Sequence, residues 1–349
     1  MVILRLSMQE SNNQKFNHLK IHTQYSICEG AIKIDNLKDF CKERKIQSIG
    51  LSDTSNLCGA LEFSENISKV GTQPIIGTQI NFKFEDTIGL IPLIALNDDG
   101  YKRIIELSSR SYLENNALSD PHCDISELYK NDKGVVILSG SIQGFFGKLF
   151  DKGRFSEIHK IYQKILSNFN NKFYLEIQRH GDQNEKIFEK YNLQKSNEFK
   201  MPIIATNEVF YLHQDMHEAH DALICIGKKT YINEKNRTKY SDQHYFKTDE
   251  EMSKLFSDLP EALENNYNLP FRCNYKPSFS KPVLPNISSE KGGNADKILT
   301  NDSEEGLKIK FKELMKVNED VLEDNSLFIK YKERLSHELK IITEMKYAS

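Results

Sequence analysis

Two histidines spaced four residues apart, His18 and His22, lie in the alternating segment H-L-K-I-H near the N-terminus. In a β-strand, residues i, i+2 and i+4 share one face, so both imidazoles would project together with the side chain of Lys20. Neutral imidazoles are common metal ligands, whereas a protonated lysine offers no lone pair. The segment therefore poses two alternatives, a metal site or the remains of one.

Three further histidines form the sharpest metal candidate by spacing alone. In L-H-Q-D-M-H-E-A-H-D, a helix would place His213, His217 and His220 on one face, where imidazoles can bind zinc. The segment directly follows a predicted strand and turn, so the three need not belong to one helix, and histidines also serve at helix ends. We favour a structural role for these three residues.

Asp53 and His180 are further candidates because each lies at the end of a predicted strand. Asp53 in L-S-D-T-S-N could cap a following helix or bind a cation, and His180 in E-I-Q-R-H-G could approach the same edge. With His22 they would form a mononuclear metal set if the strands converge. The absence of G-x-x-x-x-G-K-[ST], of a Rossmann glycine fingerprint after the first strand and of G-x-S-x-G excludes phosphate-loop and serine-hydrolase sites.

The elements that must position these side chains alternate between short apolar runs and longer segments of helical period. Strands are predicted at 18–22, 47–53, 73–82, 89–96, 134–139, 172–178 and 202–206. Helices are predicted at 35–44, 59–69, 100–112, 154–169 and 184–197. This alternation indicates an α/β barrel or a doubly wound sheet, with the chemistry at the carboxyl ends of the strands.

Composition excludes several classes of protein. The 349 residues carry 47 basic and 50 acidic side chains, so the net charge of -3 does not mark a nucleic-acid or membrane binder. The six cysteines contain no C-x-x-C pair, which argues against a zinc ribbon or a disulfide framework and predicts reduced, buried thiols. No apolar run approaches the length of a membrane span and no cleavage site follows the N-terminus, so we expect no membrane contact and a cytoplasmic location.

Residues 281–302 are rich in Pro, Gly, Ser and Asn, which is typical of a linker. Beyond them, Leu327–Met345 has the period of an amphipathic helix. We expect residues 1–14 to be a disordered extension with Met8 as an alternative start, residues 15–280 to form the main domain, and residues 303–349 to be the helical beginning of a further, truncated domain.

Six blocks of sequence, taken in order, resemble the N-terminal polymerase and histidinol phosphatase (PHP) domain of bacterial DNA polymerase III alpha subunits. They are H-L-K-I-H-T-Q-Y-S-I-C-E-G-A, L-S-D-T-S-N-L-C-G-A-L-E-F, P-I-I-G-T-Q, L-N-D-D-G-Y, L-E-I-Q-R-H-G and I-I-A-T-N-E-V-F-Y-L. The resemblance implies a distorted (β/α)7 TIM-like barrel, followed by a linker and the helical start of a polymerase core. It also implies a parent DNA-directed DNA polymerase that uses Mg²⁺, with its catalytic carboxylates outside these 349 residues.

Family members with an intact site use the same blocks to bind metal ions for phosphoester hydrolysis. By this resemblance His22, Asp53 and His180 keep ligand types, and Glu208 stands in for an aspartate. The positions that depart from ligand types are Lys20, Thr54, Gln79, Leu90 and Phe210. The resemblance thus implies a metal site that has lost about half of its ligands.

Lys20 is the most telling departure because a bound cation would lie beside its ammonium group. At about 4 Å and an effective dielectric constant near 20, the repulsion amounts to about 4 kcal/mol. We expect the ammonium to occupy the vacated site, paired with Asp53, Glu29 or Glu208, and no metal to bind. If any metal remained, its ligands would be His22, Asp53 and His180.

The resemblance leaves two candidate functions. In the first, a metal-free PHP domain is a scaffold on which a separate proofreading exonuclease subunit docks, while the replicase holoenzyme and primer-template DNA contact the rest of the parent protein. In the second, the domain is an active metal-dependent phosphoesterase or 3′–5′ exonuclease. We favour the first, because the substitutions at ligand positions oppose the second.

Overall fold

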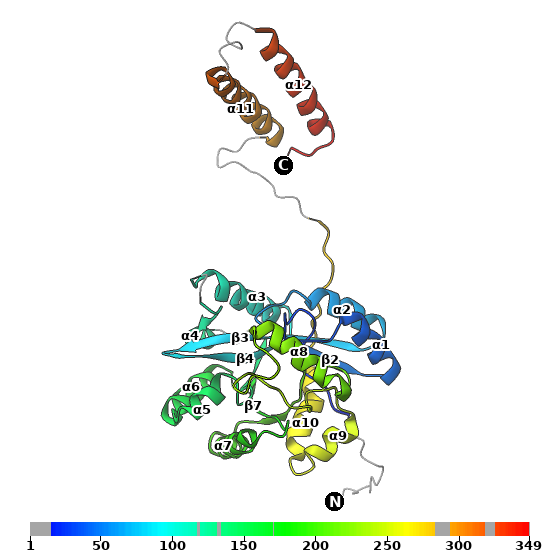
Figure 1. The fold of residues 1–349 in the computed structure, drawn as a ribbon, viewed down its shortest axis with the longest axis vertical. Coiled ribbons are helices and arrows are strands. Elements are labelled where there is room, and N and C mark those ends of the chain that lie inside the picture. The colour runs from blue at the N-terminus through cyan, green and yellow to red at the C-terminus, as the bar shows by residue number, and fades with distance from the viewer. Residues whose placement is uncertain are drawn as a thin grey trace, which may run out of the picture. The chain divides into compact units, whose positions relative to one another are not determined.

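The computed structural model describes residues 15–116, 119–130, 134–169, 171–282, 294–317 and 325–348. The chain divides into two compact units, residues 1–279 and residues 280–349. The first unit is a curled sheet with helices around its outside, and the second is a pair of helices (Figure 1).

The described strands of the first unit form one nine-stranded sheet in the order β8-β7-β6-β4-β3-β2-β1-β9, with β5 paired to β3. The strands are β1 (Lys20–Ile21), β2 (Ser48–Thr54), β3 (Gln73–Phe84), β4 (Thr87–Ala95), β5 (Cys123–Asp124), β6 (Val135–Leu138), β7 (Phe173–Ile177), β8 (Ile203–Ala205) and β9 (Glu208–Val209). Because β8 and β9 follow one another in the chain, the two ends of this order meet and the sheet curls. The predicted α/β, barrel-like fold class is confirmed.

Ten α-helices of the described residues accompany this sheet. They are α1 (Ile34–Arg44), α2 (Ala60–Lys69), α3 (Asp98–Leu113), α4 (Ile125–Tyr129), α5 (Phe145–Asp151), α6 (Phe155–Phe169), α7 (Gln183–Phe199), α8 (His217–Lys228), α9 (Asp249–Leu255) and α10 (Pro260–Asn268), with 3-10 turns η1 (Gln214–Met216) and η2 (Leu269–Arg272). In Figure 1, α1 to α4 lie on one side of the strands, and α5 to α7 with α9 and α10 lie on the other. The five helices predicted from the sequence are all present, with each end within two residues of its prediction.

The two strands predicted at 73–82 and 89–96 are both present, but they depart from the parallel arrangement of β/α units. There β3 and β4 form an antiparallel hairpin, and β4 is also antiparallel to β6. The connection is only Glu85 and Asp86, with Glu85 at φ 53°, and two residues are too few for a crossover helix. The predicted strand at 18–22 is shortened to β1, although the carbonyl of His18 and the N–H of His22 still bond to Gly50 and Val209.

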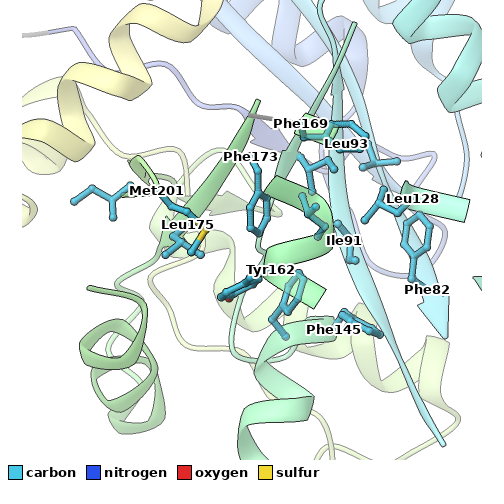
Figure 2. Packing of buried hydrophobic residues seen from close by; sticks show 14 of the residues in the cluster. Phe82, Ile91, Leu93, Leu128, Phe145, Tyr162, Phe169, Phe173, Leu175 and Met201 are labelled. Carbon is cyan, nitrogen blue, oxygen red and sulfur yellow. The ribbon is translucent and has the colours of Figure 1, made fainter. Parts of the chain in front are cut away.

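The largest hydrophobic cluster packs the β3–β4 hairpin, β6 and β7 against α3 to α6. In α6, Ile158, Ile161, Tyr162 and Ile165 are all buried, which is the helical period seen in the sequence. Figure 2 shows Phe145, Tyr162 and Phe173 in one cluster with the hairpin residues Phe82 and Ile91. This packing fixes β3 and β7 in the barrel wall, with β4 and β6 between them, and β3 and β7 each contribute a polar residue to the candidate site.

The second unit contains α11 (Ala295–Val317) and α12 (Asn325–Glu344), which pack through Phe311 and Phe328 at 4.9 Å between ring centroids. Helix α11 begins inside the range 281–302 that was expected to be a linker, so helical structure starts earlier than predicted. The expected N-terminal extension, residues 1–14, and residues 283–293 lie outside the described residues. No described helix is both long enough and apolar enough to cross a membrane.

The cysteines only partly follow the prediction of buried thiols. Four of them are buried free thiols: Cys41, Cys123, Cys225 and Cys273. Cys28 and Cys58 are exposed free thiols, which corrects the prediction for these two positions. Both exposed thiols lie in loops, where no core packing covers them.

Candidate functional site

Lys20 lies at the centre of the candidate site, on the strand that joins β2 to β9. Its side chain is 1% exposed, and Nζ lies 3.1 Å from Oε1 of Glu176 and 3.3 Å from Oε1 of Glu208. The parallel register of β1 with β9 pairs Lys20 with Glu208 directly, and Glu176 comes from β7. Burial alone would lower the pKa of Lys20, but the two carboxylates outweigh it and the pKa is raised. Lys20 is therefore a buried ammonium ion between two carboxylates.

Glu208 interacts with side chains from β1, from the turn after β1 and from β3. Oε1 accepts a hydrogen bond of 2.5 Å from Nε2 of Gln79 and lies 3.0 Å from Nε2 of His22. Burial alone would raise the pKa of Glu208, but Lys20 and His22 outweigh it and hold the pKa well below its ordinary value. Glu208 is thus an ionised carboxylate that ties β1, β3 and β9 together.

His22 is surrounded by acceptors on both sides of its ring. Nδ1 lies 3.2 Å from Oγ of Ser26, whose hydroxyl donates to Oδ1 of Asp53 at 2.8 Å, so Nδ1 must be the donor to Ser26. Nε2 lies 3.0 Å from Oε1 of Glu208 and 3.1 Å from Nε2 of Gln79. Burial alone would lower the pKa of His22, but Glu208 and Glu29 outweigh it and the pKa is raised. The carboxylates around His22 thus favour the charged form of its ring, and both of its nitrogens are engaged.

Asp53 anchors the turn that follows β1. Its carboxylate accepts hydrogen bonds from the backbone N–H of Thr23 at 2.6 Å, the hydroxyl of Thr23 at 2.7 Å and the hydroxyl of Ser26 at 2.8 Å. Burial raises the pKa of Asp53 in spite of these donors. The N-cap residue of α2 is Gly59, so the predicted alternative of Asp53 as a helix cap is wrong.

His180 is held as a neutral imidazole. Nε2 accepts the backbone N–H of Glu208 at 3.2 Å, so Nδ1 carries the proton and donates to Oε1 of Glu185 at 2.8 Å. Burial lowers the pKa of His180 to about 3. The ring stacks on His244 with centroids 4.0 Å apart. Its one lone pair is therefore already used by the backbone.

The rim of the site is apolar on one side and polar on the other. The ring of Phe210 lies 4.6 Å from that of His22 and 4.8 Å from that of Tyr240. The hydroxyl of Thr54 donates to Glu29. Leu90 and Phe210 line a cavity of about 560 Å³ that opens over this network. A cavity of this size can hold a small ligand, and its floor is the ion-paired network.

The structure brings most of the predicted site residues to one edge of the curled sheet. The residues in contact with one another there are Lys20, His22, Glu29, Asp53, Thr54, Gln79, His180, Glu208 and Phe210, with Leu90 on the cavity wall. Of the three partners expected for Lys20, only Glu208 lies within ion-pair distance. The expected pairings with Asp53 and Glu29 are replaced by the one with Glu176.

Glu176 and Gln178 also belong to the network, although neither was predicted from the sequence. Nε2 of Gln178 donates to Oε1 of Glu176 at 2.7 Å, and the hydroxyl of Thr206 donates to the same oxygen. The signal was present in F-Y-L-E-I-Q, where polar residues alternate with apolar ones in a strand that is buried throughout. A buried glutamate in such a strand indicates a buried cationic partner.

The second histidine group does not form a site. His213 precedes η1 and is exposed, whereas α8 begins at His217, so the three histidines do not share one helix. Nε2 of His217 lies 3.0 Å from the carbonyl oxygen of Tyr240, and Nε2 of His220 lies 2.8 Å from that of Glu29. Each of these two rings thus satisfies a backbone carbonyl, in line with the structural role favoured from the sequence.

The side chains of the barrel mouth do not fit a metal ion in this arrangement. The ammonium of Lys20 lies among the carboxylates, both nitrogens of His22 are engaged by neighbouring side chains, and the lone pair of His180 accepts a backbone N–H. Across the described ranges of the chain, no group of three or more His, Cys, Asp or Glu side chains is arranged to hold a metal ion.

The family model and the sequence relatives that match this chain agree with one another. Residues 18–180 match the PHP domain family. DNA polymerase III subunit alpha of Caulobacter vibrioides is 32% identical over 352 residues, which cover 97% of this chain and 30% of that protein. The corresponding subunit of Rickettsia conorii is 33% identical, and the match covers 96% of this chain and 28% of that protein. The subunit of Borreliella burgdorferi is also 33% identical, and the match covers 96% of this chain and 29% of that protein. The chain therefore spans under a third of the length of these curated relatives.

Among solved structures, an amidohydrolase from Chromobacterium violaceum superimposes with a TM-score of 0.38 at 7% identity, covering 56% of this chain and 87% of that chain. This similarity is too low to add to the family assignment, which rests on the sequence relatives.

Proposed function

This chain contains a PHP domain and is homologous to the N-terminal region of bacterial DNA polymerase III alpha subunits, and we propose that it is the metal-free scaffold of a replicative DNA polymerase. Template-directed DNA synthesis, which needs Mg²⁺, is the proposed activity of the whole protein. The 349 residues themselves are expected not to extend a primer, and a primer-extension assay that gave robust synthesis would contradict this.

The buried ammonium of Lys20 carries the proposal of a metal-free site. Lys20 and His22 bring two positive charges to the place where Glu176 and Glu208 bring two negative ones. A cation would have to displace an ion pair that already neutralises the carboxylates, and it would experience a repulsion of about 4 kcal/mol from an ammonium about 4 Å away. The family resemblance implies that phosphoester hydrolysis in PHP sites needs metal ions. We therefore propose that this site has no hydrolytic activity.

A silent site leaves proofreading to another polypeptide. We therefore propose that a separate exonuclease subunit docks on the PHP domain, and that the other replicase subunits and primer-template DNA bind elsewhere on the parent protein. The ion-paired network supports the scaffold role because it joins β1, β3, β7 and β9 without an external ligand.

Elemental analysis tests the metal-free state. The purified chain is incubated with Zn²⁺ or Mn²⁺, dialysed and analysed by mass spectrometry for bound metal, and in parallel it is assayed with p-nitrophenyl phosphate and single-stranded DNA. We expect no stoichiometric metal and no metal-stimulated hydrolysis. Stoichiometric metal together with hydrolysis would overturn the proposal in favour of an active phosphoesterase.

A binding experiment tests the scaffold role independently. The chain is immobilised and offered the proofreading exonuclease subunit of the same organism at low salt. Capture of that subunit is expected, and its absence would refute the docking role while leaving the family assignment intact.

A further inference from the structure

Four large apolar side chains are exposed on two segments, the end of α8 with the loop after it and the turn that follows β1. They are Ile27, Ile226, Tyr231 and Ile232, with exposed fractions of 83%, 71%, 77% and 57%, and we call them the isoleucine patch. Apolar groups gathered on a surface mark sites of interaction more often than isolated ones do.

The two segments of the patch are in direct contact through Gly227. A Cβ atom added to Gly227 would lie 2.5 Å from Cβ of Cys28 and 3.0 Å from its carbonyl oxygen, so only glycine permits this approach. The contact brings the turn that carries Ile27 against the last turn of α8, which carries Ile226. The isoleucine patch is therefore assembled from residues that lie far apart in the sequence.

The loop that carries Tyr231 and Ile232 is held in place by Arg237. The guanidinium of Arg237 donates to both oxygens of Asp221 on α8, at 2.6 and 2.7 Å, and to the carbonyl of Ile232 at 3.1 Å. The N–H of Tyr231 donates to Glu234 at 2.8 Å, and the N–H of Glu234 donates back to the carbonyl of Tyr231 at 3.0 Å. The exposed side chains thus project from a turn that is held by hydrogen bonds, which lowers the entropy cost of binding.

The surroundings of the isoleucine patch are positively charged. Lys228, Lys229 and Lys235 are exposed, and within the described residues none of them forms an ion pair. The one carboxylate of the loop, Glu234, is engaged with the backbone of Tyr231. The loop therefore offers aliphatic contact area with an unbalanced positive rim, which is complementary to a negatively charged, apolar partner.

We propose that the isoleucine patch is the docking surface for an acidic amphipathic segment of a partner protein, one that carries aliphatic side chains next to Asp or Glu. The composition of the patch favours a polypeptide over a nucleic acid. Three of its four side chains are aliphatic and only Tyr231 could stack on a base, whereas single strands bind to rows of aromatic rings along a basic groove. The inference rests on the proposed scaffold function, and it specifies the surface and the chemistry of the docking partner.

The test uses the full chain and the proofreading exonuclease subunit of the same organism. Ile226→Glu places a negative charge in the isoleucine patch and should weaken binding by about 10-fold or more. Ile187→Glu on α7 is the matched control, because Ile187 is 58% exposed but lies outside the patch, and it should bind like the unaltered chain. Lys235→Glu should weaken binding several-fold at low salt, and this effect should shrink as salt rises. All variants are first compared by circular dichroism and thermal unfolding.

Alkylation of Cys28 provides a second readout. This exposed thiol lies beside the isoleucine patch, so a bound partner should slow its reaction with iodoacetamide in the unaltered chain and in Ile187→Glu. The protection should be lost in Ile226→Glu. Unchanged reactivity of Cys28 in a chain saturated with partner would contradict docking at this surface.

The outcomes separate the inference from the function on which it rests. If the unaltered chain binds the exonuclease subunit and Ile226→Glu binds it equally well, the scaffold function stands and the inference fails. If the unaltered chain does not bind it, both fail. Two other outcomes would overturn the inference, provided that exonuclease binding is unchanged in Ile226→Glu. If this variant no longer binds an oligothymidylate, the patch binds nucleic acid. If it dissociates a dimer of the chain seen by light scattering, the patch serves self-association.

Discussion

Replacing Lys20 with methionine should destabilise the PHP domain strongly, although it preserves much of the side-chain volume. Nζ lies 3.1 Å from Glu176 and 3.3 Å from Glu208, and at an effective dielectric constant near 20 each contact contributes about 5 kcal/mol of attraction. Much of this attraction offsets the cost of burying the charges. The expected net loss is therefore about 3–5 kcal/mol of unfolding free energy, because the fully buried Glu176 is left as an uncompensated charge.

A double variant isolates the charge effect from the loss of packing. Glu176→Gln retains an oxygen acceptor for Gln178 but removes the charge, so adding it to Lys20→Met should restore about 1–3 kcal/mol. Urea unfolding followed by circular dichroism gives the free energies. Lys38→Met is the control, since Lys38 pairs with Asp35 at 3.5 Å on the surface, and it should cost under about 1 kcal/mol. If Lys20→Met cost no more than this control, or if the two changes were simply additive, the ion-pair reasoning would be refuted.

Three further predictions concern other features of the fold. Burial lowers the pKa of His18 from 6.5 to about 3, so below pH 6.5 the unfolded chain binds more protons than the folded chain. The unfolding free energy should therefore fall by about 1.4 kcal/mol for each pH unit below 6.5. His18→Gln should reduce the pH dependence of the unfolding free energy, measured in urea, by that amount, and an unchanged slope would contradict the shift. Gly50→Ala would place a Cβ 2.5 Å from the carbonyl oxygen of Leu19 and should cost about 1–3 kcal/mol in urea unfolding, whereas Gly306→Ala, which meets nothing within 4 Å on α11, should not destabilise the chain. Thr248→Ala removes the capping box of α9 and should cost about 1 kcal/mol by thermal unfolding, and an unchanged melting temperature would show that the cap contributes nothing.

The sequence by itself determined the elements whose signal is local. The helical period of α6, with Ile158, Ile161 and Tyr162 on one face, places that helix correctly because the period depends only on neighbouring residues. His22, Asp53 and His180 could likewise be assigned to strand ends, and their presence at one sheet edge follows from the parallel arrangement. The antiparallel hairpin of β3 and β4 was missed, because its two-residue turn of Glu85 and Asp86 carries no Asn-Gly or Asp-Gly signal.

Only the tertiary structure decided the partners and the protonation states of the site. The contact of His22 with Glu208 joins residues 186 positions apart, and the second partner of Lys20, Glu176, comes from yet another strand. Burial and neighbouring charge oppose each other in the pKa values of Lys20, His22 and Glu208, and their balance depends on distances set by the curling of the sheet. The sequence therefore supplied a lysine at a ligand position, and the closed sheet decided that this lysine is a buried ammonium between two carboxylates.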